Sequence, residues 1–284
     1  MTATELGRVG TTVPVLMYHS ISKTCTQAFR PFTVSPALFA SHVDLLVRAG
    51  YTTLTISDLA DLRRSRRPPP ARAVAITVDD AFADFSVNAL PVLAGAGLRA
   101  TLYVPTGYVG ATSRWLIAEG EQARRLLNWA ELVSIDEQGV ECGAHTHSHP
   151  QLDLVGRRFA AREVALSKAL LEDQLQHEIR TFAYPFGYSN AGVREMVEAL
   201  GFTSACRVGD LISSEADDVF AIPRLTVTPD ITPAALHQLL ASPRTSRGET
   251  LSRLRELASR GLRTARLKKR ANAPGQLPFP PTAP

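Results

Sequence analysis

Three histidines lie within five positions of the stretch ECGAHTHSHP, residues 141–150. His145 and His149 are four residues apart and follow a strand-like run, and Pro150 disfavours helical backbone at the residue before it. The pattern therefore predicts a loop at the carboxyl end of a strand. Two imidazoles in such a loop are suitable ligands for a divalent cation, but a stable site needs a third ligand.

A pair of aspartates supplies the candidate for that third ligand. In TVDDAF (77–82), an apolar strand ends at Asp79 and Asp80. Asp80, His145 and His149 would give three oxygen and nitrogen ligands and leave one coordination position open for water, as in catalytic zinc sites. Such a site lowers the pKa of the water to about 7, and Asp79 could take the proton. This set predicts hydrolysis at a carbonyl centre.

Simpler interpretations of the same residues also exist. An Asp-Asp pair at a strand end is common in turns and helix caps, and histidine-rich loops also occur as surface decoration. His147 lies between the two candidate ligands, and we expect it to point away from the metal, into solvent or a supporting role. The four-residue spacing, joined to an aspartate pair at another strand end, favours the metal site.

The elements that must position these residues alternate between strand-like and helix-like patterns. Strand-like runs occur at 13–21, 51–56, 73–78, 100–105, 140–144, 181–187, 202–208 and 221–227. Helical patterns lie between or after them, at 35–50, 57–66, 83–97, 128–139, 157–176, 190–201 and 232–240. This alternation predicts an α/β fold with a parallel sheet covered by helices, closed as a barrel or doubly wound, and we favour the barrel.

Active sites of such barrels lie where the carboxyl ends of the strands meet. The aspartate pair, the histidine loop, the YPFG run (184–187) and His19 all fall at such ends. The segment 106–128 is longer than a typical connection and carries Trp115. We expect it to form a lid or a wall of the pocket.

Several motifs resemble those of the polysaccharide deacetylases, the NodB-homology or carbohydrate esterase family 4 proteins. TVDDAF resembles the family's TFDDG motif, HTHSHP its H-[ST]-x-x-H-P motif, and FAYPFG its third motif, F-R-x-P-[YF]-G. VPVLMYHSI (13–21) and the run 128–150 are similar to the branch that includes exopolysaccharide deacetylases. Together these stretches cover roughly residues 13–230, in the order of the family.

The resemblance implies a distorted (β/α)7, TIM-like barrel and metal-dependent removal of N-acetyl, less often O-acetyl, groups from sugars. By their match to the motifs, Asp79 is the catalytic base, and Asp80, His145 and His149 are the metal ligands. The implied cofactor is a divalent ion, Zn²⁺ first, with Co²⁺, Ni²⁺ or Mn²⁺ as alternatives. The implied partner is an N-acetylated carbohydrate.

The third motif implies a substrate groove. Pro185 and Phe186 match its groove-lining positions, and the backbone N–H of Phe186 would help to stabilise the tetrahedral oxyanion. Tyr184 and Phe186 are candidates for stacking on sugar faces, with a buried core role for one of them as the alternative. His19 is a further candidate for contact with the substrate.

Three departures from the family pattern leave activity open. Ala81 stands where the family has glycine, and Ala183 stands where an arginine usually orients the catalytic aspartate. The general-acid histidine has no clean match, because His237 falls on a predicted helix; His19 and His147 are possible substitutes. A degenerate fold that binds metal or glycan without turnover is therefore the alternative. A barrel glycosidase that uses two carboxylic acids would leave the paired histidines unexplained.

Charge and composition divide the chain into parts. We expect an N-terminal extension, a deacetylase domain, a basic amphipathic helix and a disordered Pro-rich tail, at residues 1–12, 13–242, 243–270 and 271–284. Residues 244–270 hold ten Lys/Arg and two Glu, a net charge of +8, so the rest of the chain carries −4. The basic character does not indicate nucleic-acid binding. The basic helix is either docked on the barrel or held at an anionic membrane surface.

The first residues have no basic start, long apolar run or cleavage site of the kind found in secretion signals, which predicts a cytoplasmic location. The three cysteines lie at unrelated spacings and indicate neither a disulfide framework nor a thiolate metal site. Cys142 is expected to be a small residue of the core.

Overall fold

The structure is a computed structural model, and it describes residues 12–241. The chain divides into two units, Met1–Thr245 and Ser246–Pro284, and the fold described below belongs to the first. The predicted basic helix and Pro-rich tail, and all but the last residue of the N-terminal extension, lie outside the described residues.

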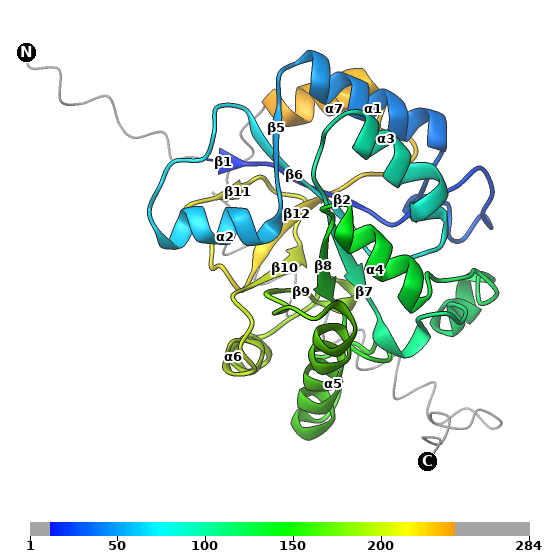
Figure 1. Cartoon of the computed structure of the whole chain (residues 1–284), viewed down its shortest axis with the longest axis vertical. Helices are drawn as coiled ribbons and strands as arrows, with labels where there is room; N and C mark the ends of the chain where they lie inside the picture. The colour runs from blue at the N-terminus through cyan, green and yellow to red at the C-terminus, as the bar shows by residue number, and fades with distance from the viewer. Residues whose placement is uncertain (1–11, 242–284) are drawn as a thin grey trace, which may run out of the picture. The chain divides into compact units, whose positions relative to one another are not determined.

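Seven parallel strands form a closed barrel (Figure 1). Their order is β2, β12, β10, β9, β8, β7 and β6, and pairing of β6 with β2 closes the ring. The strands are β2 Val15–Tyr18, β6 Ala73–Val78, β7 Thr101–Val104, β8 Glu141–Ala144, β9 Thr181–Ala183, β10 Ser204–Val208 and β12 Ile222–Thr226. The predicted barrel is therefore confirmed.

Short strands lie beside the ring. Strand β5 (Thr52–Leu54) pairs with the first half of β6, and β7 pairs with its second half. Two small pairs complete the set: β1 (Thr12–Val13) with β11 (Ser213–Ser214), antiparallel, and β3 (Ser20–Ile21) with β4 (Thr33–Val34), parallel. The strand predicted at 13–21 is thus three short strands, with breaks at Pro14, which has no N–H to donate, and at His19.

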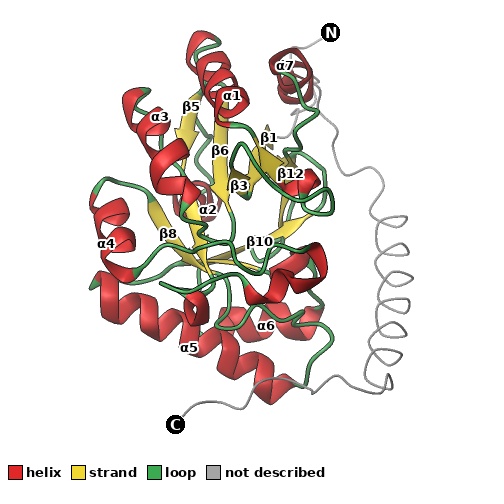
Figure 2. Ribbon diagram, turned by 90° about the vertical axis from the view of Figure 1, so that its right-hand side faces the viewer, coloured by secondary structure: helices red, strands yellow, loops and turns green. Residues whose placement is uncertain are grey.

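Helices cover the outside of the barrel (Figure 2). They are α1 Pro36–Arg48, α2 Ile56–Arg64, α3 Leu90–Gly95, α4 Trp129–Glu137, α5 Arg157–Leu175, α6 Ala191–Ala199 and α7 Pro233–Ala241. Caps fix their starts: Ser35 accepts a hydrogen bond from the backbone N–H of Leu38, and Asn128 forms a capping box with Glu131. The predicted helix at 83–97 begins instead as a π-helical turn, η2 (Phe85–Ala89).

The core has an inner and an outer layer because successive strand residues point to opposite faces. Inside the barrel, the large ring of Tyr103 is fully buried in a cluster that also holds the small side chains of Ala75, Ala183 and Cys206. A Cβ atom on Gly143 would lie 2.6 Å from that ring, so glycine makes room for it. The outer layer packs against the helices and includes Cys142, as expected.

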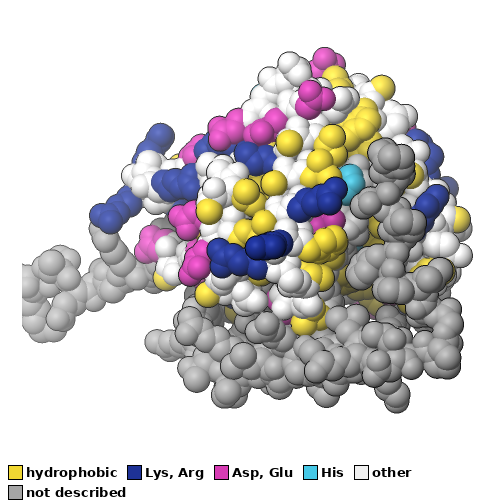
Figure 3. All heavy atoms as spheres, turned by 90° about the horizontal axis from the view of Figure 1, so that it is seen from below, with side chains coloured by type: hydrophobic (Ala, Val, Ile, Leu, Met, Phe, Trp, Pro, Cys, Tyr) yellow, Lys and Arg dark blue, Asp and Glu magenta, His cyan; other side chains and the backbone are white. Residues whose placement is uncertain are grey.

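The described surface carries charges of both signs. On the face shown in Figure 3, basic and acidic side chains lie interspersed around apolar ones. Among residues 12–241, each helix is too short or too polar to cross a lipid bilayer.

Candidate active site

A sharp turn at the end of β6 directs two carboxylates into the mouth of the barrel. The backbone N–H of Asp79 donates to the carbonyl of Tyr18 on the neighbouring strand, so pairing continues to this residue. The next two residues, Asp80 (φ 72°) and Ala81 (φ 49°), have left-handed backbone. A non-glycine residue is strained there, which explains why the resembling motif has glycine at the position of Ala81.

The three predicted metal ligands lie together in this mouth. His145 follows β8, and His149 has φ 59° in the loop after it. The Nε2 atoms of the two histidines are 3.2 Å apart, and Oδ1 of Asp80 lies 3.2 Å from that of His149 and 3.7 Å from that of His145. All three side chains are buried, and these ligand atoms lie within 4.8 Å of one another.

The chemistry of this cluster fits a divalent cation. Nδ1 of His145 is 2.7 Å from the Ala183 carbonyl, to which it donates, so its Nε2 presents a lone pair to the cluster. Burial lowers the pKa of His145 to about 4, which keeps the ring in the neutral form that binds metals. Oδ1 of Asp80 is buried and accepts no hydrogen bond from the described residues. One cation would satisfy all three groups.

A buried arginine holds Asp79 beside the cluster. Arg224 of β12 is 0% exposed, and its Nη1 and Nη2 lie 2.6 and 2.7 Å from the two carboxylate oxygens. The guanidinium stands on the ring of Tyr103, at 5.5 Å from its centroid, and also donates to the Thr77 hydroxyl. Burial by itself raises the pKa of Asp79, but the charge and hydrogen bonds of Arg224, together with the charges of His145 and His19, outweigh it and lower the pKa to about 2. Asp79 is therefore a fixed, ionised carboxylate.

Arg224 takes the place of the motif arginine that is missing at Ala183. The family motif places an arginine at that position on β9, and here the guanidinium comes from β12, two strands away. The sequence contains a weak signal for this residue, because IPRLT (222–226) places one arginine within an otherwise apolar strand pattern, but no motif marks it.

Glu163 of α5 holds the histidine loop in place through hydrogen bonds. Its buried carboxylate accepts hydrogen bonds from the backbone N–H groups of His147 and Ser148, at 3.1 and 2.6 Å, and from the Ser148 hydroxyl. The side chain of His147 turns to Thr106, 3.1 Å from its hydroxyl, and is not one of the clustered ligands. Glu163 was not predicted, because it lies on a helix with no motif.

Aromatic side chains form walls on both sides of His149. Trp115, on the 3-10 helix η4 (Arg114–Glu119), stacks on its imidazole at 4.9 Å, and Tyr108 packs behind the indole at 4.6 Å. Phe186, in the turn η5 (Pro185–Gly187), meets the imidazole edge-on at 4.8 Å and is 47% exposed. The segment 106–128 thus contributes a wall of the pocket.

The remaining predicted residues occupy different environments. His19 follows β2 and is half-buried; burial lowers its pKa, against the opposing charges of Asp79 and Asp80. Tyr184 is fully buried, and its hydroxyl donates to the carbonyl of Phe220. The assignment of Tyr184 to substrate contact was therefore wrong, and this ring takes the core role that the sequence left open. Pro185 is buried in the turn that presents Phe186.

His237 does not supply the missing acid from a strand end. It lies exposed on helix α7, which packs against α1 on the outside of the barrel. Of the alternatives considered, His19 is the one that shares the mouth of the barrel with the aspartate pair.

Comparison with known families agrees with this geometry. Residues 66–205 match the family model described as polysaccharide deacetylase, a range that holds the aspartate pair and both histidine ligands. The chain belongs to the polysaccharide deacetylase family. It is therefore an enzyme of the hydrolase class, and the three motifs are those of its family.

Two curated relatives cover most of the chain. A Bacillus subtilis (strain 168) protein that carries the name polysaccharide deacetylase YxkH is 24% identical over 230 residues, 81% of this chain and 76% of that protein. The poly-beta-1,6-N-acetyl-D-glucosamine N-deacetylase of Staphylococcus aureus (strain MRSA252) is 22% identical over 214 residues, 72% of this chain and 71% of that protein.

Solved structures of this family have the same fold. The Streptococcus pyogenes deacetylase PplD, in complex with acetate, has a TM-score of 0.71 and 25% identity, and the match covers 81% of this chain and 99% of that one. IcaB from Ammonifex degensii has a TM-score of 0.70 and 22% identity, with 82% and 98% covered.

Proposed function

We propose that this polysaccharide deacetylase removes N-acetyl groups from a glycan with the help of a divalent metal ion. One observation carries the proposal: a buried Asp80–His145–His149 cluster lies beside a second aspartate that is held ionised by Arg224. The ion pair keeps the buried aspartate in the ionised form that a catalytic base needs, at a cost in desolvation.

The residues divide the hydrolytic work between them. A cation held by the cluster, Zn²⁺ in our proposal, would polarise the acetamide carbonyl and lower the pKa of a water molecule. Asp79 is the base that takes one proton from this water as the C–O bond forms. Arg224 keeps the carboxylate ionised and aimed, and the aromatic walls of Trp115 and Phe186 limit the access of bulk water.

Two further groups serve the breakdown of the tetrahedral intermediate. The backbone N–H of Phe186 is the donor for the oxyanion. His19 follows β2, the strand paired with β6, and gives a proton to the leaving nitrogen as the C–N bond breaks, so that acetate and a free amine result. Because burial lowers the pKa of His19, the ring is neutral at rest; it takes up the proton that Asp79 removed from the water, which returns Asp79 to its ionised form before the proton passes to the leaving nitrogen.

The relatives favour a particular class of substrate. The Staphylococcus aureus protein is named for poly-beta-1,6-N-acetyl-D-glucosamine, and PplD was solved with acetate, the product that this reaction would release. We therefore propose an N-acetylglucosamine polymer, or an oligomer of it, as the substrate of this chain.

The test is acetate release from N-acetylglucosamine oligomers by chelator-treated protein before and after addition of Zn²⁺ or Co²⁺. We expect release only with metal, and a rate at least about 100-fold lower in Asp79→Asn, which should still bind the ion. Metal binding without acetate from either protein would favour the degenerate alternative. Cleavage that is unaffected by the chelator would contradict the metal mechanism.

A further inference from the structure

A second exposed aromatic ring borders the site on the side opposite Phe186. Phe32 ends the 3-10 turn η1 (Arg30–Phe32), is 38% exposed, and meets the imidazole of His19 edge-on at 5.1 Å. His19 lies within the electrostatic reach of Asp79, Asp80 and His149. Phe32 therefore places an exposed aromatic ring at the edge of the site beside His19, as Phe186 does beside His149.

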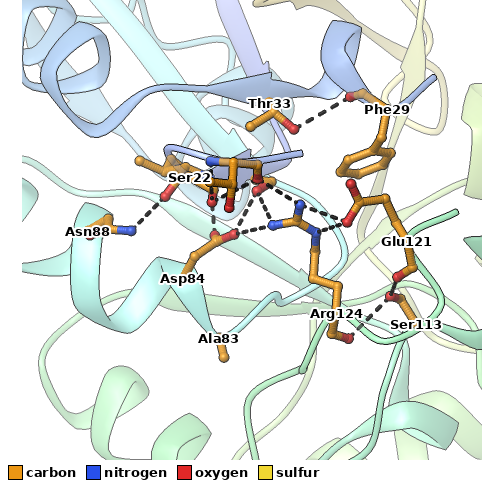
Figure 4. A network of polar contacts seen from close by, with 12 residues as sticks. Ser22, Phe29, Thr33, Ala83, Asp84, Asn88, Ser113, Glu121 and Arg124 are labelled. Atoms are coloured by element: carbon orange, nitrogen blue, oxygen red, sulfur yellow. Dashed lines mark hydrogen bonds and ion pairs between the residues drawn. The ribbon is translucent and has the colours of Figure 1, made fainter. Parts of the chain in front are cut away.

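The chain segment that carries Phe32 is held in place by a buried ionic network, shown in Figure 4. The guanidinium of Arg124, 12% exposed, lies between the carboxylates of Asp84 and Glu121, at 3.2 and 2.9 Å. The same group donates to the Ser20 hydroxyl and to the carbonyl of Thr24. Arg124 therefore links Ser20, which follows His19, to Thr24, where the segment that leads to Phe32 begins.

Apolar packing and an ion pair hold the rest of this segment. Phe29 is buried beneath Phe32, with ring centroids 5.6 Å apart, and the Arg124 guanidinium lies 5.3 Å from the Phe29 ring. Arg30 pairs with Asp230 at 2.7 Å on the other side of the turn. An exposed phenyl ring on such a fixed support presents a preorganised surface, which reduces the entropy lost on binding.

We propose that Phe32 is a second sugar-binding platform, on which a pyranose ring stacks while a neighbouring sugar of the same chain occupies the metal site. Pyranose rings have an apolar C–H face that suits an aromatic ring, and ligand sites combine such rings with a few polar groups. The substrate class is then an oligomer or polymer that reaches from the metal site to Phe32, rather than a single sugar. This inference rests on the proposed function for the identity of the sugar.

The test compares the binding of a β-1,6-linked N-acetylglucosamine pentamer with that of N-acetylglucosamine by calorimetry. The parent protein carries Asp79→Asn so that turnover does not consume the ligand. Phe32→Leu keeps an apolar side chain without the ring, and Phe32→Tyr keeps the ring. Val87→Ala, at an exposed apolar residue of η2, is the control for surface changes.

We expect Phe32→Leu to bind the pentamer about tenfold more weakly, with unchanged affinity for the single sugar. Phe32→Tyr and Val87→Ala should bind as the parent does. Equal pentamer affinity in Phe32→Leu, equal losses for both ligands, or no pentamer binding by the parent would overturn the inference. Acetate release by the wild-type chain is measured separately, so failure of the proposed activity is distinguished from failure of the platform.

Discussion

The ion pair between Asp79 and Arg224 determines how the second aspartate of the site behaves. Both groups are almost completely buried, so each compensates the desolvation of the other. The pair joins residues that are 145 positions apart in the chain. A sequence motif reports neighbours along the chain, and for this reason it identified the aspartate but not its partner.

Replacing Arg224 with methionine should lower the free energy of unfolding by about 3–5 kcal/mol, because an uncompensated carboxylate remains buried. Chemical denaturation monitored by fluorescence measures this change. Adding Asp79→Asn removes the charge, so the double variant should lose less stability than the two single losses combined. Simple additivity would show that the two groups do not stabilise each other.

His19 provides a second prediction at the scale of single residues. His19→Ala should lower kcat for acetate release by about 10²–10⁴-fold, because the leaving nitrogen loses its proton donor. Metal content and the melting temperature should stay near the wild-type values, since the side chain lies outside the ligand cluster. A wild-type rate would transfer the acid role to another group.

At the scale of elements, each ligand is placed by a strand end and then by a turn in strained backbone. Left-handed φ values occur at five non-glycine residues of the loops around the site: Asp80, Ala81, Thr146, His149 and Phe186. Such strain persists only where surrounding contacts impose it. For the histidine loop, those contacts come from Glu163 of α5.

Glu163→Gln should weaken metal affinity by about tenfold while leaving the helical content unchanged. The uncharged amide accepts weaker hydrogen bonds from the loop, and supporting groups of metal sites have effects of this size. Competition with a coloured chelator measures the affinity. Asp173→Asn, at an exposed position of the same helix, is the matched control. Equal metal affinities in the two variants would show that Glu163 does not support the metal site.

Several elements could be predicted from local signals, and others could not. Ser35 and Pro36 mark the start of α1 in the sequence, and the helix begins there. The helix expected at 83–97 starts with a π-helical turn, because Pro91 has no N–H to donate and the backbone N–H of Leu90 bonds to Phe85. Local propensity indicates a helix in both places but does not specify the hydrogen-bond pattern.

At the scale of the whole molecule, strand–helix alternation predicted a parallel sheet covered by helices, and the resemblance of the motifs to a barrel family favoured the closed form. Neither predicted the inward column of Tyr103, Arg224 and Asp79, which requires the relative register of three strands. Inward positions recur every second residue, so a single arginine in an apolar strand could have been assigned to the interior. Which of the rings of Tyr184 and Phe186 lies in the core, and which faces the pocket, likewise depended on the residue at which β9 ends.

The basic segment beyond the barrel gives a prediction for the intact chain. Removing residues 245–284 takes away most of the +8 charge and should abolish association with anionic liposomes. The melting temperature should not change, because the barrel belongs to the separate unit Met1–Thr245. Sedimentation with vesicles measures the association, and equal binding before and after truncation would contradict a membrane role.

The central claim is that Asp80, His145 and His149 hold one cation beside an aspartate fixed by Arg224. A crystal structure of the chain soaked with Zn²⁺ and acetate tests it most directly. We predict one ion within about 2.0–2.2 Å of Oδ1 of Asp80 and Nε2 of each histidine, with acetate completing its coordination and Asp79 still paired with Arg224. An ion bound elsewhere, or a site that stays empty at saturating Zn²⁺, would contradict it.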